Sequence, residues 1–145
     1  MSARAVLPCI AVLLVVAATP ARDAKKELEK LQGEWTGVSL EENGKKIPDG
    51  HVKKFKLTIK GEKWMVQFGD KQVGDATFKI DPAKDPKRID MTFKVEGDDL
   101  DSHGIYKVDG DTLTLCRAHG KAERPKEFKG KDDQYNIEVW KRVKK

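Results

Sequence analysis

The chain has 145 residues, with 29 basic and 24 acidic side chains and a formal net charge of +5. Lysines and acidic residues alternate along most of its length, which indicates a solubilising surface and argues against a basic stripe for nucleic acid. The length suits one domain after an N-terminal targeting segment.

Residues 1–21 have the pattern of a secretory signal peptide: Arg4 supplies a positive charge, residues 5–18 are largely apolar, and small residues follow. A membrane anchor is the alternative, but the apolar stretch is shorter than the ~20 residues of a spanning helix. We therefore expect a mature domain at 22–145 that begins near Arg22 and is periplasmic or extracellular. Loss of Cys9 leaves only Cys116, so no intramolecular disulfide can form.

The elements that follow are one short helix and many short strands. Residues 23–32 predict a helix with apolar residues on one face, and Gly33 ends it. Alternation of apolar and polar residues predicts strands, bounded by turn signals such as Asn43-Gly44 and 109–111. The predicted strands are 33–42, 55–59, 64–68, 76–80, 89–95, 104–108, 112–116 and 135–139, with Phe128 in a further short one. The acidic residues 96–102 are expected to form a loop.

These strands follow one another with mostly short connections, which is typical of a β-sandwich or an up-and-down barrel. The order of hairpins favours the barrel. We therefore predict an all-β fold, an antiparallel up-and-down barrel of about eight strands with a short N-terminal helix.

The start of the first strand, Gly33-Glu34-Trp35, resembles the Gly-x-Trp opening of lipocalins. The resemblance implies that Trp35 closes one end of the barrel and that Arg142 packs over its ring, as a guanidinium does well. In a regular strand Trp35 lies on the same face as Gly37, whereas Leu40 lies on the opposite face. A β-bulge in this strand would reconcile the two.

Longer motifs resemble an uncharacterised lipocalin-like domain family that is abundant in planctomycete bacteria, usually behind a signal peptide. The matching segments are 31–35, 43–48, 80–82, 104–116 and 124–128. The resemblance extends from about Leu28 to Arg142. Because that family has no established activity, the resemblance implies a fold and an exported location only.

Metal sites are not expected. Asp99, Asp101 and His103 imitate the front of a calcium loop, but Gly110 stands where the bidentate acidic ligand is needed. The three histidines are scattered, without the spacing of a zinc site.

Catalytic groups are not expected either. Cys116 is interpreted as a partly buried, inert thiol, and the acidic residues at 98–101 as a solvated surface. Ser39 and Ser102 are the only serines after residue 21, and neither lies in a nucleophile elbow. We therefore expect no catalytic residues, no metal and no cofactor.

Alternation also predicts which side chains point into the barrel. These are Phe55, Leu57, Ile59, Val66, Phe68, Phe78, Ile80, Met91, Phe93, Leu113 and Leu115. A cavity among them should be apolar and lined by Phe68, Phe78, Met91, Phe93 and Tyr106, with Tyr106 as a polar group. Trp140 falls on the face opposite Ile137 and Val139, and we expect it to cover the helix or to form an exposed apolar spot.

The function expected from the sequence is non-enzymatic binding of a small apolar ligand or a cell-envelope component. The alternative is a structural or protein-interaction module with a filled barrel, and an enzyme is third. We expect no nucleic-acid partner and no membrane span after cleavage. The sequence does not specify an oligomeric state.

Overall fold

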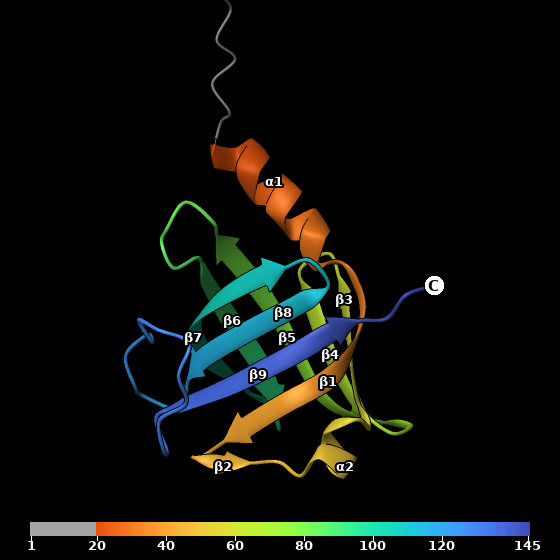
Figure 1. Cartoon of the computed structure of the whole chain (residues 1–145). Coiled ribbons are helices and arrows are strands. Elements are labelled where there is room, and N and C mark those ends of the chain that lie inside the picture. Colours follow the sequence, from red (N-terminus) through yellow and green to blue (C-terminus); the bar gives the residue numbers. More distant parts are fainter. Residues whose placement is uncertain (1–19) are drawn as a thin grey trace, which may run out of the picture.

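The computed structural model describes residues 20–145, which form an N-terminal helix, a one-turn helix and a β-barrel (Figure 1). Residues 1–19, most of the predicted signal peptide, lie outside the described residues. In chain order the elements are α1 (Pro20–Leu31), β1 (Gly33–Glu42), β2 (Lys45–Lys46), α2 (Asp49–Val52), β3 (Phe55–Lys60), β4 (Lys63–Phe68), β5 (Lys71–Asp81), β6 (Arg88–Val95), β7 (Asp98–Asp109), β8 (Thr112–Ala118) and β9 (Tyr135–Arg142).

The barrel is a continuous antiparallel sheet. From β3 to β9 each strand pairs with the next, β1 pairs with β3, and pairing of β1 with β9 closes the sheet. The short β2 adds only to the end of β1. The predicted fold class, an all-β up-and-down barrel of eight strands, is therefore confirmed.

A β-bulge in β1 reconciles its two apolar faces. The register between β1 and β9 shifts between Gly37 and Ser39. Val38, the extra residue, is 50% exposed, while Trp35 and Leu40 are both buried in the core. The bulge that the sequence required is present.

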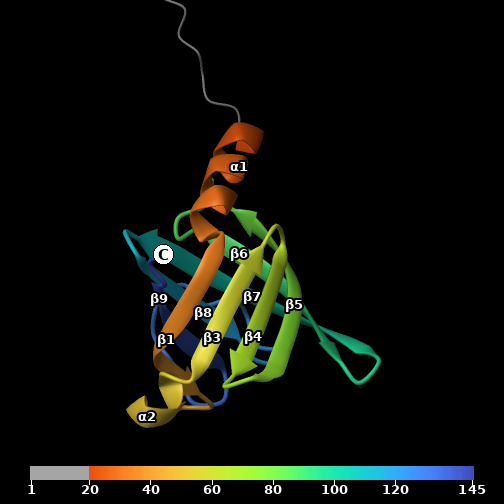
Figure 2. The same cartoon turned by 90° about the vertical axis from the view of Figure 1, so that its right-hand side faces the viewer.

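The helix α1 lies over one end of the barrel (Figures 1 and 2). Leu31 belongs to the hydrophobic core and Leu28 packs against it. Glu27 is buried and bonded to Lys87 in the β5–β6 connection (2.6 Å) and to Lys30 (3.2 Å). Leu28, Leu31 and the ion pairs of Glu27 together hold α1 on the barrel. A helix of this length would be only marginally stable alone.

Part of the predicted acidic loop is a strand instead. Residues 98–102 belong to β7 and pair with β6, and the resulting hairpin projects from the barrel (Figure 2). Lys94 donates to Asp99 (2.7 Å) and Thr92 donates to Asp101 (2.8 Å) across this hairpin. Cross-strand pairs thus stabilise a segment whose acidic composition suggested a loop.

The connection between β8 and β9 covers the outer face of β8. Cys116 and Ala118 are buried although they point away from the barrel interior. Cys116 Sγ contacts the Lys129 carbonyl at 3.6 Å. Phe128 lies in this connection and not in a strand, so that prediction was wrong.

Candidate ligand-binding site

The end of the barrel under α1 is closed. The guanidinium carbon of Arg142 lies 4.2 Å from the centroid of the Trp35 ring, and Arg142 Nη1 donates to the Gln32 carbonyl (2.7 Å). Trp35 Nε1 donates to the Leu31 carbonyl (3.0 Å). Gly33 has φ +118°, a conformation that favours glycine, at the sharp turn from α1 into β1. The predicted packing of Arg142 on Trp35 is present.

Three of the five residues expected to line a cavity lie in solid core. Phe78, Met91 and Tyr106 are buried with their neighbours in the packed interior. The Tyr106 hydroxyl has no hydrogen-bond partner among the described residues. Burial, followed by the charges of Glu27 and Asp81, raises its pKa. Those neighbours place Tyr106 near α1, so it is not a polar group of an open cavity.

Phe68 lies at the opposite end, where it packs on Phe55 with ring centroids 4.8 Å apart. It does not line the cavity there, and of the five expected residues only Phe93 does. The expected cavity was misplaced because alternation shows which face a residue occupies but not how deeply the barrel is filled along its axis.

A cavity of about 350 Å³ opens at the barrel end opposite α1, which we call the mouth. Its volume is at the lower end of the range for small-molecule sites. It is lined by Leu40, Glu41, Glu42, Ile47, Phe55, Trp64, Val66, Val73, Gly74, Phe93, Arg117, Asn136, Glu138 and Trp140.

One wall of the mouth is apolar. Phe55, Trp64, Val66 and Phe93 reach it from strands β3, β4 and β6. Gly74 on β5 adds space, because a methyl group there would lie 3.4 Å from Val66 Cβ and meet nothing closer. Residues of this kind favour a ligand with an apolar body.

The facing wall, on β8 and β9, is polar. Arg117 Nε donates to Glu138 Oε1 (3.1 Å), and Trp140 Nε1 donates to Glu138 Oε2 (3.1 Å). The Arg117 and Glu138 side chains are only 18% and 14% exposed. The Arg117 guanidinium also lies 4.9 Å from the Phe93 ring centroid, which connects the two walls. A charged pair held in this way is a rigid part of the cavity surface.

Gly104 on β7 makes room for this arrangement. A Cβ at this position would lie 2.7 Å from the Cys116 carbonyl oxygen and 3.1 Å from Arg117 Cβ. Since Gly104 and Arg117 are direct cross-strand partners, the missing side chain lets Arg117 lie close to β7.

Asn136 is the most informative residue of the mouth. It is 2% exposed, and its Oδ1 accepts a hydrogen bond from the backbone N–H of Asn43 (3.2 Å). Its Nδ2 is buried and has no partner among the described residues. A buried donor without a partner is costly, and this one belongs to a side chain in the cavity wall. The mouth therefore holds a hydrogen-bond donor that a ligand could satisfy.

Sequence reasoning missed the polar wall. On β9, Ile137 and Val139 suggested the inward face, but Asn136, Glu138 and Trp140 occupy it and Trp140 is fully buried. The outer face of the neighbouring β8 is covered by the connection to β9, so apolar residues occur on both faces of this part of the sheet. Alternation alone cannot separate such faces.

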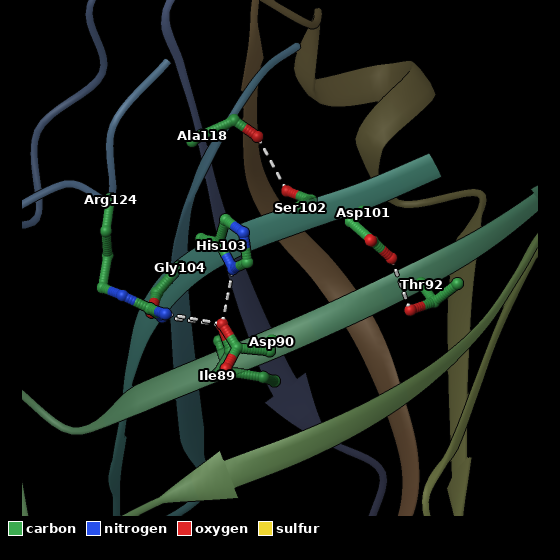
Figure 3. Close-up of polar contacts among 9 residues, drawn as sticks. All are labelled: Ile89, Asp90, Thr92, Asp101, Ser102, His103, Gly104, Ala118 and Arg124. Carbon is green, nitrogen blue, oxygen red and sulfur yellow. Dashed lines mark hydrogen bonds and ion pairs between the residues drawn. The ribbon is translucent and has the colours of Figure 1, made fainter. Parts of the chain in front are cut away.

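A second polar cluster lies on the outside of the barrel (Figure 3). Asp90 Oδ1 bonds to His103 Nδ1 (2.7 Å) and accepts from Arg124 Nη2 (2.6 Å). Desolvation raises the pKa of Asp90, but the hydrogen bonds from His103 and Arg124 outweigh it, so the pKa lies below its ordinary value. Arg124 Nη1 also donates to the Ile89 and Gly104 carbonyls (3.1 and 2.7 Å).

This cluster lacks the parts of a catalytic site. The Ser102 hydroxyl donates to the Ala118 carbonyl (2.7 Å) and is not directed at His103 (Figure 3). Asp90 and His103 are both about half exposed, and of the two only Asp90 lines an open surface pocket. The contacts of Arg124 tie the β8–β9 connection to β6 and β7, which is a structural role.

Two further kinds of candidate chemistry are metal ligation and the Cys116 thiol. Residues 20–145 contain no group of three or more side chains that could hold a metal ion. Burial raises the pKa of Cys116, which is consistent with an inert thiol.

Within the same residues, no helix has the length and apolar character needed to cross a membrane.

Comparisons of the chain with protein-family models, with curated proteins and with solved structures found no match. The resemblance to a lipocalin-like family therefore stays a prediction from the sequence.

Proposed function

We propose that the protein is an exported, non-enzymatic, lipocalin-like binding protein whose mouth holds one small, mostly apolar molecule with a hydrogen-bond acceptor. The ligand would be a free small molecule or a component of the cell envelope. The observation that carries the proposal is the buried, unpartnered Nδ2 of Asn136 in the wall of a cavity of about 350 Å³.

The walls of the cavity support this role. Phe55, Val66 and Phe93 would contact the apolar body, and burial of that surface would supply most of the affinity. Asn136 would fix the orientation by donating to the acceptor group. At about 30 Å³ per heavy atom, taken from the liquid volume of a water molecule, the cavity has room for about a dozen non-hydrogen atoms.

Titration with the uncharged fluorescent probe 1-naphthylamine, which is within the dozen or so non-hydrogen atoms that the cavity accommodates, tests the proposal. We expect saturable one-to-one binding, accompanied by a change in tryptophan emission because Trp64 and Trp140 line the cavity. Gly74→Val should weaken binding about tenfold or more, since overpacking costs about 1–3 kcal/mol. Thr77→Val, on the exposed outer face of the same strand, is the matched control and should bind as the wild type does.

Two results would reject the proposal. One is a folded protein that shows no saturable binding, which would favour the structural or interaction module. The other is unchanged affinity in Gly74→Val, which would place the bound probe elsewhere on the molecule.

Export is proposed from the sequence of residues 1–21. The expected mature start near Arg22 falls in the first turn of α1, which begins at Pro20. N-terminal sequencing of the exported protein tests it, and recovery of an intact Met1 start from a soluble cytoplasmic pool would contradict it.

A further inference from the structure

We infer that the mouth selects a ligand with an uncharged amide head group over an ionised carboxylate or ammonium, although an arginine lies in its wall. This inference rests on the proposed function and names the class of ligand for the same site. It follows from how the charges of the mouth are already paired and from which hydrogen-bonding groups remain free.

The charge of Arg117 is neutralised within the cavity wall. Its Nε donates to Glu138 Oε1 at 3.1 Å, and the other oxygen of Glu138 is held by Trp140 Nε1. Both members of the pair are largely removed from solvent, which strengthens their attraction and fixes their geometry. An incoming carboxylate would therefore meet a guanidinium whose positive charge Glu138 already balances.

The remaining charges of the lining disfavour an anion further. Glu42, at the end of β1, also lines the cavity, so with Glu138 two carboxylates stand against one arginine. The Glu41 carboxylate lies beside Gly130 on the outer face and is not part of this balance. The lining contains no lysine and no histidine. A ligand carboxylate would therefore enter a negative environment, and like charges brought together in a partly desolvated site cost several kcal/mol.

A cation is disfavoured by the hydrogen-bonding groups. Nδ2 of Asn136 is a donor without a partner. Among residues 20–145 the one hydrogen bond of the Arg117 guanidinium comes from Nε, which leaves Nη1 and Nη2 as further donors. An ammonium group has no lone pair to accept from these donors, and it would place a positive charge beside Arg117.

An amide satisfies the same groups without adding charge. Its carbonyl can accept from Asn136 Nδ2 and from Arg117, while its N–H can donate to a lone pair of Glu138 that the two existing bonds leave free. Its alkyl chain then lies along Phe55, Val66 and Phe93. The site thus combines a neutral, self-paired polar wall with an apolar wall of limited size.

Three ligands with the same alkyl chain separate these cases: octanamide, octanoate and octylamine. At pH 7 only octanamide is uncharged, and each is within the dozen or so non-hydrogen atoms that the cavity accommodates. Displacement of the fluorescent probe gives the three dissociation constants. We expect octanamide to bind about tenfold or more tightly than either charged analogue.

Glu138→Gln tests the physical cause. It removes the neutralising charge from Arg117 while keeping a side-chain oxygen, so octanoate should gain at least about tenfold relative to octanamide. Glu62→Gln makes the same chemical change in the β3–β4 turn, at the α1 end of the barrel and outside the cavity lining. The order of affinity of the three ligands for this control should equal the order for the wild type.

The outcomes distinguish the inference from the proposed function. If the fluorescent probe binds in the mouth but octanoate or octylamine binds the wild type as tightly as octanamide, the selection of an uncharged head group is wrong and the binding function stands. If neither the probe nor any of the three ligands binds, the proposed function fails as well. If Glu138→Gln does not fold, the wild-type ranking alone still decides.

Discussion

At the α1 end the barrel interior is filled by Trp35, Tyr106 and their aliphatic neighbours, and Arg142 covers it from outside. At the mouth the same sheet leaves a cavity and places an arginine, a glutamate and an asparagine among aromatic rings. Both regions are built from one set of strands, so the difference lies in which residues occupy the inward positions at each level. It shows that one barrel can be tightly filled at one end and keep a cavity with polar groups at the other.

The largest expected effect is the loss of the closing tryptophan. Trp35→Ala should lower the free energy of unfolding by about 3–5 kcal/mol, because a large, fully buried ring is deleted. Phe55→Ala, at the mouth, removes a half-buried ring that faces a cavity and should cost clearly less. Urea denaturation of both variants measures the contrast, and equal losses would contradict the division into a packed end and an open end.

Removing one member of the Arg117–Glu138 ion pair should lower the free energy of unfolding more than replacing both members. Glu138→Leu leaves Arg117 uncompensated in a largely buried site and should destabilise the fold by about 3 kcal/mol. The double substitution Arg117→Leu, Glu138→Leu should recover most of this loss, because no charge is then left unpaired. A double-mutant cycle by urea denaturation checks this. A double variant no more stable than Glu138→Leu would mean that the pair is essential to packing.

Two glycines of the interior should respond oppositely to one methyl group. Gly104→Ala brings a Cβ to 2.7 Å from a backbone oxygen and should cost about 1–3 kcal/mol. Gly74→Ala meets only an ordinary contact with Val66 and should stabilise by about 0.4–1 kcal/mol through the unfolded chain. Thermal unfolding of the two variants gives the signs, and destabilisation by Gly74→Ala would show that the mouth is more tightly packed than the cavity indicates.

The smallest effect concerns the ion pair that docks α1. Desolvation raises the pKa of Glu27, but its bonds to Lys87 and Lys30 outweigh it, so the pKa lies below its ordinary value of 4.5. The resulting stabilisation is therefore fully present above pH 4.5 and is lost as the pH falls through the lowered pKa. Glu27→Gln should lower stability by about 1 kcal/mol at pH 7, because both lysines are partly exposed.

Melting temperatures of the wild type and Glu27→Gln between pH 7 and pH 3 check the sign. The difference between the two proteins should shrink as the pH falls below 4.5. A difference that grows on acidification would mean that Glu27 is protonated more easily in the folded state than in the unfolded state.

The barrel could be predicted from the sequence because its evidence is local. Phe78, Met91 and Phe93 alternate with polar residues, and a turn residue follows almost every strand. The contact of Arg142 with Trp35 was predictable only through a resemblance to lipocalins. Its geometry joins residues from the two ends of the sheet, and no local pattern encodes that pairing.

The mouth could not be predicted because it depends on the register of the strands and on which sheet faces the loops cover. Arg117 pairs directly with Asn136, and Glu138 lies opposite the neighbouring Leu115, so the ion pair is a diagonal contact that exists in one register only. Trp140 was misread because Ile137 and Val139 are also apolar. A signal was available in the charged residues at alternate positions of strands that otherwise resemble core, since such residues are rarely buried unless paired.

The pairing of β1 with β9 has a consequence for how the chain folds. The barrel closes when Trp35 meets Arg142, so the residues that complete it are separated by most of the described chain. Contacts of this kind give a high contact order and slow folding, because loop-closure entropy is lost before the last strand contributes. Until Tyr135–Arg142 has left the ribosome, β1 and β8 each lack their β9 neighbour and present open edges to other chains.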